Sequence, residues 1–126
     1  MRRLATLVLL LGVTAACGDT STSPASTTTD TLSGTVQPAS QSVQTFTASG
    51  SGTVTATATS LSPQATVGLE VGTLNGTSCS AIAQASVQQG GSITASLSSS
   101  GTYCTMVYDT GSLTAAVAYT VTVVHP

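Results

Sequence analysis

The sequence predicts an all-β protein, an antiparallel β-sandwich of about eight strands that follows an N-terminal signal peptide. Short runs in which apolar and polar residues alternate recur at intervals of about 8 to 12 residues, a spacing typical of sandwiches. Gly, Ser, Pro and Asn separate these runs, and no convincing helical pattern follows the signal. The expected strands are 32–36, 43–48, 53–61, 66–74, 79–87, 92–97, 101–109 and 115–124.

The first three strands are delimited by turn residues. Pro38 ends the first strand, because proline cannot donate to a ladder hydrogen bond. The second contains Phe46, the single phenylalanine, and is followed by the glycine-rich turn 50–52. The third, 53–61, alternates valine and alanine with threonine at a period of two, and Pro63 ends it.

The fourth strand, 66–74, places Val67, Leu69 and Val71 on one face and Glu70 on the other. We therefore expect Glu70 to be a solvated strand carboxylate. Asn75-Gly76 then indicates a tight hairpin turn, which also explains the glycosylation sequon Asn75-Gly76-Thr77.

The remaining four strands differ in how clearly they are marked. Segment 79–87 is ambiguous, because its alanines also suit a helix. Segment 92–97 follows Gly90-Gly91, and 101–109 carries Tyr103 and Tyr108 on opposite faces, so one of the two is expected in the core. Segment 115–124 ends the domain with a regular apolar alternation.

Residues 1–17 resemble the signal peptide of a bacterial lipoprotein. Arg2 and Arg3 precede an apolar segment, 4–13, which is too short to span a membrane and ends in small residues before Cys17. The resemblance implies cleavage after residue 16 and acylation of Cys17, so that acyl chains hold the protein on the membrane. Thr14 departs from the family, which usually has an aliphatic residue there. The alternative is an ordinary signal peptide and simple secretion.

Composition limits the partners of the mature protein. Removal of residues 1–16 takes away both cations of the chain, and the remainder contains Asp19, Asp30, Glu70, Asp109 and one histidine. A protein without lysine or arginine cannot neutralise phosphates, so we expect no nucleic-acid binding. The same absence argues against electrostatic attachment to anionic lipid, which leaves the acyl chains on Cys17 as the expected membrane contact.

The cysteines predict one disulfide. With Cys17 assigned to lipid, Cys79 and Cys104 form the remaining pair, and two thiols in an exported chain normally bridge. One histidine and two cysteines are too few for a structural zinc site.

The chain divides into three segments. Residues 1–16 form the signal peptide, 17–31 form a Ser/Thr-rich tether that begins at the lipid anchor, and 32–126 form the β-sandwich domain. The 110 residues that remain after cleavage suffice for one domain.

Three elements resemble the bacterial pre-peptidase C-terminal domains and similar modules of exported proteins. They are residues 32–34 with 44–52, the Gly-Thr-Tyr element 101–103, and the closing strand 119–123. The resemblance implies a jelly-roll-like sandwich over residues 31–126 that serves as a non-catalytic accessory. Some such domains bind extended polymers or calcium. This chain has few aromatic and acidic residues, so no binding site is carried over.

No residues form a convincing catalytic or metal-binding set, and we expect neither a catalytic site nor a cofactor. The one possible histidine base, His125, is expected to be frayed and solvated after the last strand. Glu70 and Asp109 could act as a carboxylate pair or join Asp30 around calcium only if the fold brought them together. Asp109-Thr110-Gly111 is typical of a turn.

The sequence therefore predicts an exported lipoprotein at the cell envelope, facing the periplasm or the cell exterior. Its expected role is that of a non-catalytic structural or accessory module. The alternative is a module that binds an envelope carbohydrate or protein, which we expect to display a patch of exposed tyrosines. A hydrolase is not expected.

Overall fold

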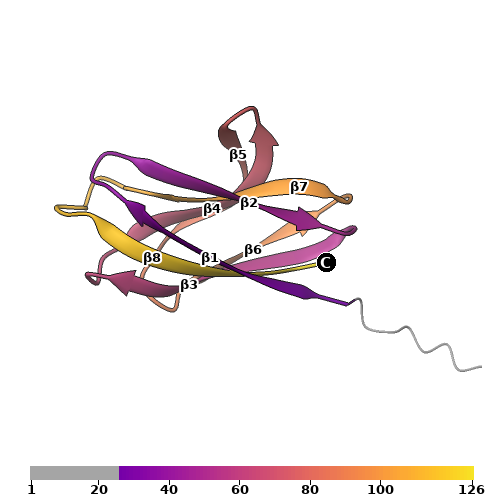
Figure 1. Ribbon diagram of the computed structural model, residues 1–126, viewed down its shortest axis with the longest axis horizontal. Helices are drawn as coiled ribbons and strands as arrows, with labels where there is room; N and C mark the ends of the chain where they lie inside the picture. Colours follow the sequence, from indigo (N-terminus) through magenta and orange to yellow (C-terminus); the bar gives the residue numbers. More distant parts are fainter. Residues whose placement is uncertain (1–25) are drawn as a thin grey trace, which may run out of the picture.

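Eight antiparallel strands form two four-stranded sheets in the computed structural model, which describes residues 26–126 (Figure 1). The predicted all-β sandwich is confirmed, and the ambiguous segment 79–87 is a strand. The strands are β1 (Thr28–Val36), β2 (Gln41–Ala48), β3 (Gly52–Ser62), β4 (Val67–Asn75), β5 (Ser78–Val87), β6 (Ser92–Leu97), β7 (Gly101–Tyr108) and β8 (Val117–His125).

The strand order is that of a jelly roll. One sheet has the order β1-β8-β3-β6 and the other β2-β7-β4-β5. Strand β1 pairs with β8, β2 with β7, β3 with β6 and β4 with β5. The chain is thus one long hairpin rolled up so that successive strand pairs fall alternately into opposite sheets, the arrangement expected of a double Greek key.

The core lies between the two sheets and consists mainly of valine, alanine and leucine side chains. Strand β8 shows the expected period of two, because its odd-numbered residues from Val117 to His125 are buried and the others are more accessible. Phe46 and Tyr103 stack across β2 and β7 with ring centroids 5.9 Å apart. Tyr103 is therefore the core tyrosine of the predicted pair.

Strand β1 begins at Thr28, inside the segment predicted as tether. Its register with β8 runs from Thr28↔His125 to Val36↔Val117. Residues 28–31 are polar and carry no apolar alternation, yet threonine is β-branched and suits an edge strand that finds partners along β8. The signal peptide 1–16 and the predicted lipidation site Cys17 lie outside the described residues.

The two ends of the sandwich carry different connections. The start of β1 and the end of β8 lie at one end with the connections 49–51 and 98–100, whereas the β4–β5 hairpin with its connection 76–77 projects from the sheet away from this end (Figure 1). The opposite end carries the connections 37–40, 63–66, 88–91 and 109–116. The described part contains no helix that could span a membrane.

Candidate functional site

Strand β4 is buried on both faces from Val67 to Gly72, as is its neighbour β7 from Tyr103 to Val107. Val67, Leu69 and Val71 point into the core, as predicted. The other face was expected to be solvated, and that prediction is wrong, because the Glu70 side chain is only 4 % exposed.

The cause is the β4–β5 hairpin, which curls away from the plane of the sheet (Figure 1). The pairing of β4 with β5 shifts between Val71 and Gly72, a bulge that bends the hairpin. The backbone oxygen of Ser80 then lies where a side chain at position 72 would stand, so only glycine fits there. The folded hairpin shelters the outer face of β4.

A disulfide holds the hairpin in this position. Cys79 on β5 and Cys104 on β7 are bonded, as predicted, with their Cα atoms 5.8 Å apart. Strand β4 lies between β5 and β7 in the sheet, so the bridge passes over β4. Cys104 pairs in register with Gly72, and the missing side chain there leaves room for the crossing.

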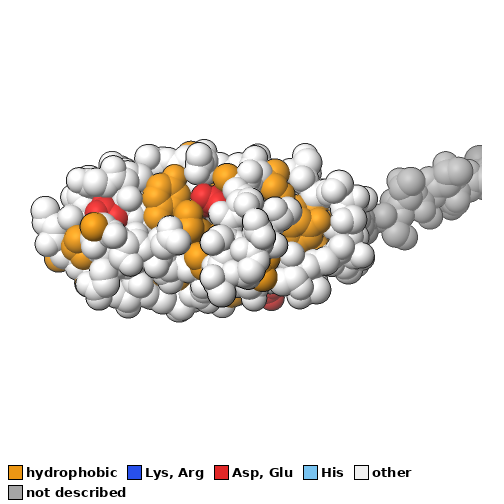
Figure 2. All heavy atoms as spheres, turned by 90° about the horizontal axis from the view of Figure 1, so that it is seen from above, with side chains coloured by type: hydrophobic (Ala, Val, Ile, Leu, Met, Phe, Trp, Pro, Cys, Tyr) orange, Lys and Arg blue, Asp and Glu red, His pale blue; other side chains and the backbone are white. Residues whose placement is uncertain are grey.

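Tyr108 closes the other side of Glu70. Its ring occupies the space that a side chain on Gly68 would take, directly across from it in the β4–β7 pairing. Met106 is the register partner of Glu70 on β7, and Gln84 is its partner on β5. Hydrophobic and acidic side chains therefore lie next to each other on this sheet, which Figure 2 views from its outer side.

We call this arrangement the Glu70 trough: Glu70 at the base, Met106 and Gln84 on the flanking strands, Tyr108 at one end and the backbone of Ser80 at the other. Two buried side-chain atoms within residues 26–126 have no hydrogen-bond partner. They are Oε1 of Glu70 on β4 and Oγ1 of Thr105 on β7. Burial raises the pKa of the Glu70 carboxyl, since desolvation disfavours its charged form.

Asp109 organises the loop end of the sandwich. Its Oδ1 accepts hydrogen bonds from the backbone N–H groups of Gly111, Ser112 and Leu113 at 2.8 to 3.1 Å, and Oδ2 accepts one from Ala39 at 2.8 Å. The amides of Ala39 and Leu113 are the main causes that lower the pKa of this carboxyl. The predicted turn is confirmed, with Gly111 at φ +102°.

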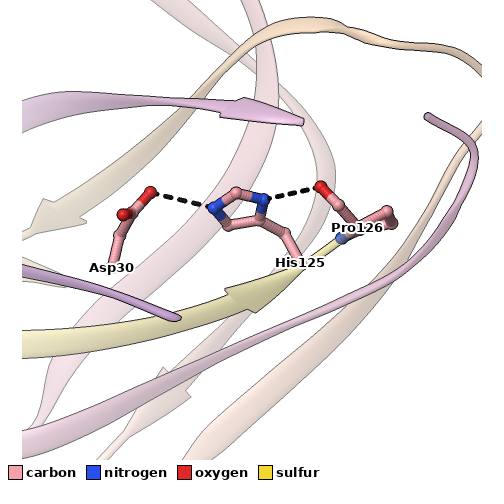
Figure 3. A network of polar contacts seen from close by, with 3 residues as sticks. All are labelled: Asp30, His125 and Pro126. Atoms are coloured by element: carbon pink, nitrogen blue, oxygen red, sulfur yellow. Dashed lines mark hydrogen bonds and ion pairs between the residues drawn. The ribbon is translucent and has the colours of Figure 1, made fainter. Parts of the chain in front are cut away.

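His125 is buried and bonded on both sides, so the prediction of a frayed, solvated side chain is wrong. Its Nε2 lies 2.8 Å from Asp30 Oδ2 and its Nδ1 lies 3.0 Å from the main-chain oxygen of Pro126 (Figure 3). The ring also packs on Phe46, with centroids 4.9 Å apart. His125 continues the inward odd-numbered series of β8, which was the signal for its burial.

The structure does not bring the candidate catalytic residues together. Asp109 bonds to Ala39 just beyond the end of β1, whereas His125 pairs with the first residue of β1. The length of β1, about 25 Å at 3.3 Å per residue, separates these two groups. Both ring nitrogens of His125 lie within hydrogen-bond distance of oxygen atoms of Asp30 and Pro126, so neither is directed at a nucleophile. Glu70 lies on β4, and it is not among the hydrogen-bond partners of Asp109 or His125.

Other expected ligand features are not found in residues 26–126. No three His, Cys, Asp or Glu side chains there are close enough to hold a metal ion. Tyr103 and Tyr119 are buried and Tyr108 is partly covered, so the described part shows no patch of exposed tyrosines. A shallow depression of about 320 Å³ at the loop end, lined by residues of 63–66 and 112–117, contains no titratable side chain.

Comparison with known proteins adds no relationship. Neither the models of known protein families nor the curated proteins searched contain a match to this chain. The resemblance to pre-peptidase C-terminal domains thus stays a prediction, and only the jelly-roll arrangement that it implied is found in the structure.

Proposed function

We propose that this protein is an exported lipoprotein and that its jelly roll serves as a non-catalytic structural or accessory module at the cell envelope. The observation that carries the proposal is the Cys79–Cys104 disulfide. It pairs two of the three cysteines and leaves Cys17, at the end of a lipoprotein-like signal, as the cysteine available for acylation. Stable disulfides also belong to exported rather than cytosolic chains.

The position of β1 is compatible with a short attachment. Ten residues, 18–27, separate Cys17 from the start of β1 at Thr28. A chain of ten residues spans at most about 35 Å when fully extended. An anchored domain would thus stay near the membrane, with its β1–β8 end toward the lipid and the loops 37–40, 63–66, 88–91 and 109–116 directed outward.

The lack of cationic side chains supports anchoring by acyl chains rather than by electrostatic attraction between the protein surface and the membrane. Residues 4–126 contain no lysine or arginine, so the domain offers nothing to attract an anionic membrane. One acyl chain alone would bind only marginally, and the several chains of a bacterial lipoprotein would hold the domain firmly.

Intact-mass spectrometry of the protein expressed in a bacterial host tests the proposal. We expect a mass that corresponds to residues 17–126 plus acyl chains and rises by about 2 Da on reduction, as one disulfide becomes two thiols. The variant Cys17→Ser should lose the acyl mass and keep the disulfide. An unacylated mass for the unaltered protein would contradict the anchor and indicate simple secretion. A second variant, Thr14→Leu, would then show whether Thr14 is the cause.

A carbohydrate- or protein-binding module is the alternative function. The missing patch of exposed tyrosines in residues 26–126 removes the surface that we expected for binding a polymer by stacking. Pull-down on isolated envelope polysaccharide tests this alternative directly.

A further inference from the structure

The Glu70 trough contains a carboxylate that the domain itself does not neutralise. Oε1 of Glu70 is sealed from solvent and accepts no hydrogen bond within the described residues. A buried charge without a partner is costly, and proteins usually pair it or bury it only where it has a function.

No positive charge of the domain can reach this carboxylate. Its single histidine, His125, is bonded to Asp30 at the end of the sandwich near the start of β1. Lysine and arginine do not occur after Arg3. A cation that pairs with Glu70 must therefore come from another molecule.

The surroundings of Glu70 favour an ammonium over other cations. A guanidinium binds best with two parallel hydrogen bonds to both carboxylate oxygens, but Oε1 is enclosed, which leaves Oε2 for a single contact. An ammonium acts as a point charge and suits a single contact. Calcium needs six or more oxygen ligands, and Glu70 belongs to no group of three His, Cys, Asp or Glu side chains in residues 26–126 that could hold a metal ion.

The partly exposed ring of Tyr108 offers apolar surface for the chain that carries the ammonium, whereas Met106 is buried at 9 % exposure. Met106 flanks Glu70, and the ring of Tyr108 covers Gly68 beside it. Methylene groups pack on such surface, and a cation beside a tyrosine ring gains cation–π attraction.

The hairpin next to the trough indicates a partner larger than a free amine. Leu74 and Ile82 are the exposed large hydrophobic residues of the described part, at 39 % and 43 % exposure, and both lie on the β4–β5 hairpin. We propose that the Glu70 trough binds a lysine side chain of a partner protein, whose apolar neighbours contact Leu74 and Ile82.

The test uses a short peptide and NMR titration of the ¹⁵N-labelled protein. The probe is acetyl-Leu-Lys-Leu-amide, and the matched control has norleucine in place of lysine, which removes the ammonium and keeps the methylene chain. We expect saturable shifts at Gln84, Met106 and Tyr108 with a dissociation constant of roughly 1 mM or below. The norleucine peptide should bind at least about tenfold more weakly, a difference of 1.4 kcal/mol.

Two variants separate a specific site from general charge attraction. Glu70→Gln should abolish the lysine preference, whereas Asp30→Asn removes the same charge at the other sheet and should leave it intact. A second readout is the ¹³C titration of the Glu70 carboxyl, whose raised pKa should fall when the peptide is bound.

Each contrary result overturns a defined part of the proposal. Equal binding of the lysine and norleucine peptides, or unchanged binding in Glu70→Gln, would overturn the ammonium site. Butylamine that binds as tightly as the peptide would overturn the protein partner and assign the trough to a small amine. None of these results depends on acylation of Cys17, so the lipid anchor is tested separately.

Discussion

The outer faces of the two sheets of this jelly roll differ in their exposure to solvent. In the sheet β1-β8-β3-β6, strands such as β6 alternate strictly between exposed and buried residues, with serine and threonine outside. In the sheet β2-β7-β4-β5, every residue of β4 from Val67 to Gly72 is buried. The difference shows that alternation in sequence predicts burial only where the outer face meets water.

Two glycines and a disulfide make the second sheet different. Gly72 admits the backbone of the folded hairpin, Gly68 admits the ring of Tyr108, and the Cys79–Cys104 bridge passes over β4. The outer face of β4 thus becomes a second, small interior that contains Glu70. The experiments below separate the contributions of these features, beginning with the largest expected effect.

Removal of the disulfide should have the largest effect. The bridge closes a loop with a sequence separation of 25, for which the chain-entropy model predicts about 3 to 4 kcal/mol of stabilisation. Full reduction, or the double variant Cys79→Ser/Cys104→Ser, should lower the melting temperature by roughly 10 to 20 °C. Calorimetry with and without reductant measures this change. An unchanged melting temperature would show that packing alone holds the hairpin.

Gly72→Ala should be the next most damaging change. The added Cβ would collide with the backbone oxygen of Ser80, which cannot rotate away, so we expect a loss of about 2 to 3 kcal/mol. The matched control is Gly50→Ala, whose Cβ would meet no atom within 4 Å and should cost no more than about 0.5 kcal/mol. Urea unfolding measures both variants, and equal losses would contradict the folded hairpin.

Asp109 should make the loop end sensitive to acid. Its pKa is lowered by hydrogen bonds from backbone amides, so its contribution to stability is present above the ordinary aspartate pKa and is lost as the pH falls through the lowered value. Asp109→Ala should speed hydrogen exchange of the Gly111 and Ser112 amides by about tenfold. Exchange at the amides of β8 provides the internal reference. Unchanged rates at both loop amides would refute this role of Asp109.

Glu70 should contribute a pH dependence of stability that is opposite in sign to that of Asp109. Its pKa is raised by burial, so the folded protein loses stability as the pH rises above the ordinary glutamate value of about 4.3. Without a ligand, Glu70→Gln should be more stable by about 1 kcal/mol at pH 7 and show almost no difference at pH 4. Urea unfolding at both pH values measures this. A less stable variant at pH 7 would mean that the ionised carboxylate is satisfied within the protein.

The smallest change in stability is expected for a substitution on the outer face of the sheet β1-β8-β3-β6. Thr94 lies exposed on β6, so Thr94→Ala should change the unfolding free energy by less than about 0.5 kcal/mol. A larger loss, measured by urea unfolding, would show that this outer face is covered as well.

The sequence predicts the strands well, because their apolar alternation and turn residues are local signals. All eight expected strands are present, and the turn after Asn75 is confirmed with Gly76 at φ +65°. The jelly-roll order depended on the resemblance alone, since it requires pairings as distant as Thr28 with His125.

The candidate site could not be predicted in the same way. Burial of Glu70 results from a hairpin that folds back over its own sheet, and alternation within β4 contains no sign of that contact. The glycines at positions 68 and 72, on either side of Glu70, were the available hint that other groups cover this face. For His125, the inward series of β8 would have predicted burial had the strand been extended by one residue.

The pairing of β1 with β8 also has a consequence for the time at which the domain can fold. The first strand of the jelly roll finds its ladder partner only in the last one, about a hundred residues later in synthesis. A chain that emerges from its N-terminus onward therefore cannot complete this sheet until β8 has followed. Until then the polypeptide lacks its β1–β8 pairing, an incomplete state that suits the export that we propose.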